Sequence, residues 1–230
     1  MAMSITTDAG LYRLLTWLSP AYPLGAFSFS HGVEYAVEAG LVCDAASLEQ
    51  WIATVLHDGA GRIDAALLAA AWRAARAGDA AALDAAIELA GAWRGTAETA
   101  LESLSQGTAF VATTRRAWPD AALDALARRE EPVALPVAVA VAAAAGGIGL
   151  EAALLAYTHA LAANLVSAGI RLIPLGQTEG QRVIAGLEAA VMDACRRALD
   201  DPLDAVGTGA PLLDWCSMQH ETQYTRLFRS

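Results

Sequence analysis

The stretch SPAYPLGAFSFSHGVE, residues 19–34, interrupts a chain that is otherwise rich in alanine and leucine. Its prolines, glycines and aromatic residues are Pro20, Pro23, Gly25, Gly32, Tyr22, Phe27 and Phe29. Proline fixes φ and lacks an N–H, and glycine opens backbone angles that other residues avoid. The stretch therefore predicts a shaped, non-helical connector between two helices. A connector with large aromatic side chains is usually packed on its own domain or bound by a partner.

Helical signals dominate on both sides of this connector. Apolar residues recur at helical spacing, and capping residues, glycines and prolines mark the ends of the segments. The expected helices cover residues 11–18, 31–39, 44–57, 62–77, 79–93, 96–118, 120–129, 135–145, 150–168 and 178–199. Strand patterns, a dinucleotide-binding glycine motif and internal repeats do not stand out. The sequence thus predicts an all-α, single-domain bundle of roughly eight to ten helices, covering residues 1–206, with a C-terminal docking tail, residues 207–230.

Composition excludes several classes of function. The 230 residues are 56% hydrophobic, which is enough for a large core, and the net charge is −10. Such a charge argues against binding to nucleic acid or to an anionic membrane. All 15 basic residues are arginine. Without lysine, the chain has neither the P-loop lysine of a nucleotidase nor the Schiff-base lysine of a pyridoxal-phosphate enzyme.

The cysteine content, the N-terminal segment and the composition of the longest apolar run point to a cytoplasmic protein. Three well-separated cysteines do not form a disulfide framework. The N-terminal segment MAMSITTDAG lacks the basic and apolar regions of a secretory signal. Residues 133–150 are uncharged, but the run consists mainly of alanine and valine and is broken by one proline and three glycines. We therefore expect a buried helix there rather than a membrane span.

The connector does not carry a nucleophilic triad of a known type. Ser28 and Ser30 lie near His31, but no GxSxG motif and no preceding strand are present. Ser30 is more simply interpreted as an N-cap for the helix that follows. We expect no catalytic residues here.

Metal ligands occur only in pairs. His31 and Glu34 are three residues apart, and Cys216 and His220 are four apart. A structural or catalytic metal needs three or four ligands, so neither pair is sufficient by itself. We expect no resident metal and no cofactor.

Two further segments carry polar or aromatic side chains of interest. Gln177 and Gln181 flank a helix start, where Thr178 and Gln181 match a capping box. The alternative is a polar contact at a helix N-terminus, where an anionic group would be favoured. The tail combines aromatic residues with arginines, which are enriched in interface hot spots. A terminus of this kind is expected to dock, either on its own domain or on a partner.

Three motifs resemble the UreF family of urease accessory proteins. The first is Ser19-Pro20 with Pro23-x-Gly25-x-Phe27-Ser28-x-Ser30-x-Gly32-x-Glu34. The second runs from Leu161-Ala-Ala-Asn164 through Ile170-Arg171-Leu172-Ile173-Pro174-Leu175-Gly176-Gln177 to Gly180-Gln181. The third is the tail, Ser217-Met218-x-His220-Glu221-Thr222-Gln223-Tyr224-x-Arg226-Leu227-Phe228-Arg229-Ser230. His31 stands where many members of the family carry Gln.

The resemblance implies a homodimeric, non-catalytic accessory protein for the nickel centre of urease. It implies binding to a UreD-type (UreH-type) accessory protein, and recruitment and modulation of the UreG GTPase at the urease apoprotein. The residues that it assigns to a GTPase-facing surface are Pro23, Gly25, Phe27, Ser28, Ser30, Gly32 and Glu34, with Glu34 as the charged contact. Those that it assigns to docking of the UreD-type partner are His220, Tyr224, Arg226, Phe228 and Arg229, ordered on binding. A metal-dependent hydrolase and a helical adaptor of an unrelated complex are the alternatives.

Overall fold

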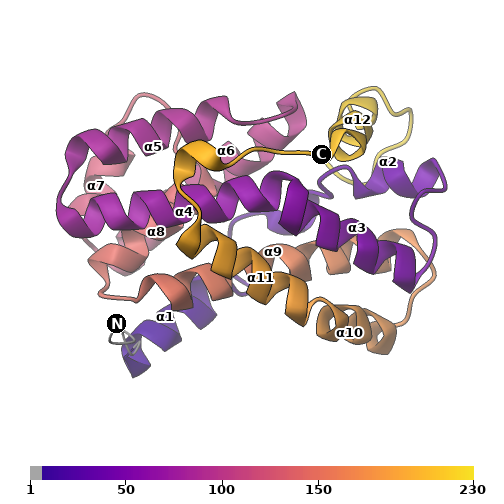
Figure 1. Cartoon of the computed structure of the whole chain (residues 1–230), viewed down its shortest axis with the longest axis horizontal. Helices are drawn as coiled ribbons and strands as arrows, with labels where there is room; N and C mark the ends of the chain where they lie inside the picture. The colour runs from indigo at the N-terminus through magenta and orange to yellow at the C-terminus, as the bar shows by residue number, and fades with distance from the viewer. Residues whose placement is uncertain (1–6) are drawn as a thin grey trace.

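The computed structural model describes residues 7–230, which form twelve α-helices and two short 3₁₀ helices (Figure 1). Residues 1–6, which begin the segment searched for a secretory signal, lie outside the described residues. The helices are α1 (Asp8–Trp17), η1 (Ala26–Ser28), α2 (Val33–Glu38), α3 (Ala45–Asp58), α4 (Ala60–Ala77), α5 (Ala80–Ala92), α6 (Ala97–Ala117), α7 (Ala121–Ala127), α8 (Leu135–Ala145), α9 (Leu150–Leu172), α10 (Gln177–Gly186), α11 (Glu188–Asp200), η2 (Leu203–Ala205) and α12 (Pro211–His220). Strands are absent from residues 7–230, so the all-α prediction is confirmed.

Helix α8 lies at the centre of the bundle and contacts α4, α5, α6, α7 and α9. Residues Leu135 to Ala144 are all buried, which confirms the buried helix expected within residues 133–150. Alanine and valine on every face let neighbouring helices approach closely. Gly107 of α6 lies directly against the backbone of residues 133–135, where any side chain would collide. Small residues therefore set the distance between α6 and α8.

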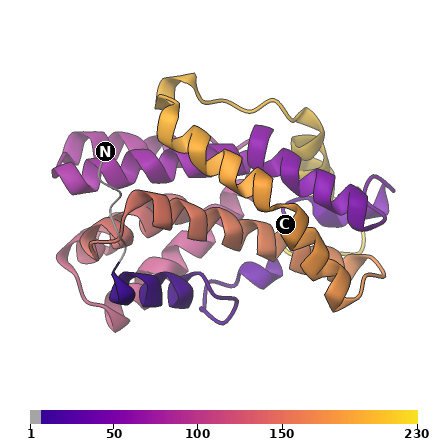
Figure 2. The ribbon, with the colours of Figure 1, turned by 60° about the horizontal axis from the view of Figure 1, so that its bottom comes forward.

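Helix α9 is the longest, and it passes through the middle of the bundle (Figure 2). By length and composition alone it could cross a membrane, but half of its most apolar 18-residue window is buried. It contacts α1, α2, α3, α4, α8, α10 and α11. Contacts with so many helices are typical of a core helix, and a core helix can match a membrane span in length and composition.

The predicted helix count was too low for two reasons. The helix expected over residues 178–199 is divided at Leu187 into α10 and α11, and Gly186 packs against the carboxylate of Glu49 at the break. In addition, the tail contains α12, which was not expected. The helix expected from His31 begins instead at Val33, because His31 and Gly32 have positive φ of 56° and 79°.

The tail is folded onto the domain to which it belongs. Helix α12, at the upper right of Figure 1, contacts α2 and α6. A hydrogen bond from Gly209 N to Asp58 O, of 2.8 Å, holds the segment before it to α3. The tail is thereby brought beside the connector, although the two are almost 200 residues apart in the sequence.

Candidate functional site

The connector and the end of the tail, residues 20–34 and 220–230, meet in one place that we call the junction. Ser30 N–H donates to Ser230 O over 2.6 Å, and the Ser30 hydroxyl donates to the same oxygen over 2.6 Å. Both residues are fully buried. The two unusual segments of the sequence therefore form a single structural unit.

Glu34 of α2 is the main anchor of the tail. Its Oε2 accepts from His220 Nε2 over 2.8 Å and from Phe228 N–H over 2.9 Å, and its Oε1 accepts from Leu227 N–H over 2.6 Å. The residue is only 6% exposed. A buried carboxylate with three donors is well satisfied, and removal of its charge would leave those donors without an equivalent acceptor.

His220 bridges two carboxylates in the interior. Its Nδ1 lies 2.8 Å from Glu98 Oε2, and Arg226 Nη1 donates to Glu98 Oε1 over 3.0 Å. Burial raises the pKa of Glu98, while His220 and Arg226 oppose that rise. Both ring nitrogens of His220 therefore face carboxylate oxygens, and the guanidinium of Arg226 places a positive charge beside Glu98. A network of this kind tolerates burial better than an isolated charge.

Arginine–aromatic contacts close the outer side of the junction. The guanidinium of Arg171, from α9, lies 4.2 Å from the ring centroid of Phe228 and 6.0 Å from that of Phe27. Its Nη1 also donates to Phe27 O over 2.5 Å. Arg229 lies 5.4 Å from the ring centroid of Phe29. Connector, tail and α9 are thus held together by stacking of the weakly hydrated guanidinium group.

Close backbone approach explains one glycine of the motif. Gly32 has a φ of 79°, and a Cβ at this position would lie 3.1 Å from the backbone nitrogen of Ser217 in α12. Any other residue would be strained and would press on the tail helix. Gly32 therefore has a packing role rather than a contact role at the surface.

The residues predicted from the resemblance divide into an outer and an inner set. Those that are exposed are Pro23, Gly25, Phe27, Tyr224, Arg226 and Arg229, with Ser28 half-buried. Those that are buried are Ser30, Gly32, Glu34, His220 and Phe228. Glu34 is therefore not an exposed charged contact as expected, because its carboxylate is taken up by the tail. The tail itself is already packed, which differs from the expectation that it becomes ordered on binding.

The two glutamines lie outside the junction, and Gln181 lines a pocket that Phe27 of the connector also lines. Gln177 and Gln181 are exposed on α10, at the lower edge of Figure 1 and away from α12. The helix cap also differs from the expected one, since Glu179 Oε2 accepts from Gly176 N–H over 2.9 Å and Gly176 is the N-cap. Gln181 is thus not needed for the cap, and its role as a polar contact stays a prediction.

His31 and Glu34 face different partners, and both ring nitrogens of His220 are taken up by carboxylates rather than by Cys216. His31 Nδ1 lies 2.9 Å from Glu102 Oε2, while Glu34 faces His220. Cys216 is buried, and burial raises the pKa of its thiol to about 11. Within residues 7–230, groups of three or more His, Cys, Asp or Glu side chains suited to a metal ion are not found.

Sequence reasoning missed two residues that organise the junction. Glu98 lies in the middle region, where only generic helical patterns were recognised, and a single acidic residue in a helix gives no sign that it will be buried. Arg171 stood within a recognised motif but was not singled out. An arginine beside a helix end, near a proline and a glycine, could have been weighed as an aromatic partner.

Comparison with known proteins places the chain among urease accessory proteins. The family model described as UreF matches residues 42–188. A urease accessory protein UreF from Granulibacter bethesdensis is 57% identical over 228 residues, covering 99% of this chain and 97% of that protein. Proteins of the same name from Rhodopseudomonas palustris strain TIE-1 and Bradyrhizobium sp. strain ORS 278 are 52% and 50% identical, covering 97% and 96% of this chain and 93% and 92% of their own lengths.

Proposed function

The chain belongs to the UreF family of urease accessory proteins, and we propose that it is a non-catalytic scaffold for maturation of the urease nickel centre. In this role it binds a UreD-type accessory protein and recruits and modulates a UreG-type GTPase at the urease apoprotein. The chain works in the cytoplasm, as a homodimer. Its lack of lysine is consistent with this division of labour, because the nucleotide is then handled by the partner GTPase.

The observation that supports the proposal is the outer face of the junction. Phe27 is 68% exposed, Leu227 57% and Tyr224 is fully exposed, and the tail also exposes Arg226 and Arg229. Aromatic residues and arginine dominate the energetics of protein interfaces. Because the inner set of buried residues already holds this face in place, docking does not have to overcome the entropy of ordering the tail.

The arrangement assigns different roles to the two sets of residues. The exposed members contact partners directly, with the GTPase on the connector side and the UreD-type protein on the tail side. Glu34 and His220 are positioning residues, which act through the tail. The two partners then adjoin at the junction, so each should affect the affinity of the other for this chain.

Complementation tests the function as a whole. The gene should restore urease activity to a strain that lacks its own UreF, and purified urease from that strain should contain nickel at the level of the parent strain. The readout is nickel per urease active site. If the chain is produced in soluble form together with the strain's other accessory proteins and urease still lacks nickel, the proposal is wrong.

A further inference from the structure

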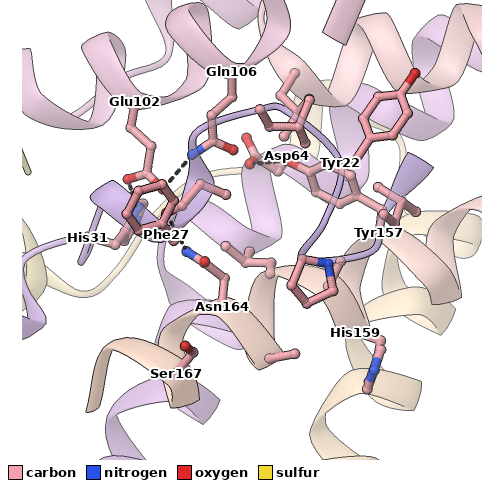
Figure 3. Close-up of a pocket in the computed structure, with 18 of the residues that line it drawn as sticks. Tyr22, Phe27, His31, Asp64, Glu102, Gln106, Tyr157, His159, Asn164 and Ser167 are labelled. Carbon is pink, nitrogen blue, oxygen red and sulfur yellow. Dashed lines mark hydrogen bonds and ion pairs between the residues drawn. The ribbon is translucent and has the colours of Figure 1, made fainter. Parts of the chain in front are cut away.

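A buried ion pair between His31 and Glu102 ties the connector to α6. His31 Nδ1 lies 2.9 Å from Glu102 Oε2, and Glu102 Oε1 accepts from Gln106 Nε2 over 3.2 Å (Figure 3). The side chains of His31 and Glu102 are only 11% and 8% exposed. Both residues line a pocket of about 380 Å³ beneath the connector, which gives water a route to the imidazole. The pair is thus largely buried, yet it can exchange a proton with the solvent.

The other charged groups that act on His31 are Asp64 of α4 and Arg94, which precedes α6. Arg94 Nη1 donates to Asp64 Oδ1 over 2.7 Å, and Tyr157 Oη of α9 donates to Asp64 Oδ2 over 2.7 Å. Among the described residues, Glu102 forms its ion pair with His31 alone. Loss of a proton from His31 would therefore leave Glu102 as a buried carboxylate without a cation of its own, which is unfavourable.

The backbone of His31 is strained. Its φ is 56°, and within residues 7–230 it is the one non-glycine residue with a positive φ. The left-handed region is unfavourable for a residue with a Cβ, so the surrounding contacts have to hold it there. The ion pair with Glu102 is such a contact. Weakening the pair therefore favours relaxation of the connector at this residue.

A change at His31 reaches the tail through the neighbouring residue, Ser30. The N–H and the hydroxyl of Ser30 both donate to Ser230 O over 2.6 Å. Ser230 Oγ in turn donates to Glu102 Oε2 over 3.4 Å. The end of the tail is thus bonded both to the residue before His31 and to the carboxylate with which His31 is paired.

We propose that His31 and Glu102 form a pH-sensitive latch, which holds the end of the tail on the connector while His31 is charged and releases it when His31 loses its proton to water. Burial disfavours the charged imidazole, but the charge of Glu102 and its hydrogen bond outweigh burial and raise the pKa of His31. The latch is therefore fully closed below the unfolded pKa of about 6.5 and opens as the pH rises through the higher folded pKa. Its effect on partners rests on the proposed function, because the latch holds the tail side of the outer face.

Amide hydrogen exchange of the chain alone, between about pH 6 and pH 9, tests the latch on both sides of a histidine pKa. Protection factors taken against an unstructured peptide at each pH remove the intrinsic pH dependence of exchange. The reporter amides are those of Ser30 and Arg229, which donate to Ser230 O and Ser28 O. We expect their protection to fall about fivefold or more with rising pH, because a charged hydrogen bond becomes a neutral one. The midpoint should coincide with the pKa of His31 measured by NMR of its ring protons.

Three variants separate the latch from other pH effects. His31→Gln keeps a polar side chain that does not titrate, so the reporter amides should lose this pH dependence. His57→Gln makes the same change at a half-buried histidine on α3 and should keep the parent profile. Glu102→Gln removes the charge that holds the proton and should move the fall in protection to lower pH.

Two results would overturn the latch. One is reporter protection that stays level across the pH range in the parent chain. The other is a fall of the same size and midpoint in His31→Gln as in the parent. Since no partner is present in these measurements, either result would leave the proposed scaffold function as it stands.

Discussion

Replacing Glu34 by glutamine should release the tail without unfolding the domain. Glu34 accepts one hydrogen bond from His220 and two from the backbone N–H groups of Leu227 and Phe228. A hydrogen bond to a charged group contributes about 1.5–3 kcal/mol, and a neutral one about 1 kcal/mol. Glutamine keeps one acceptor oxygen but loses the charge, so we expect about 2–3 kcal/mol less stability for the docked tail. Since 1.4 kcal/mol is a factor of ten, the tail should open about 30–150 times more often.

Amide hydrogen exchange measures this opening directly. The amides of Leu227, Phe228 and Arg229 are bonded only while the tail is docked, the last to Ser28 O over 2.7 Å. Their exchange should accelerate by the factor above in Glu34→Gln, while amides of the buried helix α8 keep their parent rates, because local opening does not require global unfolding. Glu88→Gln, an exposed position on α5, is the control and should leave the tail unchanged.

Two results would refute this reasoning. Tail exchange that is unchanged in Glu34→Gln would mean that the carboxylate does not hold the tail. Equal acceleration of tail and α8 amides would mean that Glu34 supports the whole domain rather than the junction.

Three further predictions follow from the packing and the charges. Gly107→Ala should destabilise the protein by about 3 kcal/mol, seen as a lower Tm, because a methyl group would meet the backbone of residues 133–135. Gly91→Ala on α5 has open space around the new methyl group and should instead stabilise the protein by about 0.4–1 kcal/mol. A lower Tm for Gly91→Ala than for Gly107→Ala would contradict the packing described. Arg171→Ala should accelerate exchange of the tail amides about fivefold through loss of roughly 1 kcal/mol of stacking, and an unchanged rate would argue against the contact. Burial opposes the charge of His31, but Glu102 outweighs burial and raises the pKa of His31 in the folded state. The stability that charged His31 contributes is therefore complete below its unfolded pKa of about 6.5 and is lost as the pH rises through its folded pKa. Denaturant unfolding of His31→Gln should show a smaller loss of stability with rising pH than the parent does, and identical pH profiles would exclude this role.

The helical architecture could be predicted because its signals are local. Asp44, Asp79 and Thr96 each cap the helix that was expected to follow them, and alanine and valine around α8 indicated complete burial. The break between α10 and α11 had no such signal, because Gly186 is tolerated inside a helix and its contact with Glu49 is made across the fold. Local chemistry predicts ends of helices better than it predicts bends caused by a neighbour.

The sequence indicated which segments form the candidate site, but it did not indicate that the connector and the tail pack against each other. The proline–glycine pattern and the aromatic tail were both recognised as unusual. Their meeting depends on Glu34 and His220, which were expected to contact partners, and on Glu98, which was not singled out. Charged residues are rarely buried unless they are paired, and the pairing here joins residues 122 and 186 positions apart in the sequence. Such a pairing has no signature in a single sequence.

The central claim is that the exposed face of the junction captures the partners. The measurement is the affinity of the UreG-type GTPase and of the UreD-type protein for a Phe27→Ala/Tyr224→Ala variant, with Tyr12→Ala on exposed α1 as the control. Both aromatic side chains are exposed, so the variant should stay folded, with at most a small fall in Tm from the lost contact between Arg171 and the Phe27 ring. We predict that it binds both partners at least tenfold more weakly, while Tyr12→Ala binds both as the parent does. A folded double variant that captures both partners with parent affinity would contradict the account.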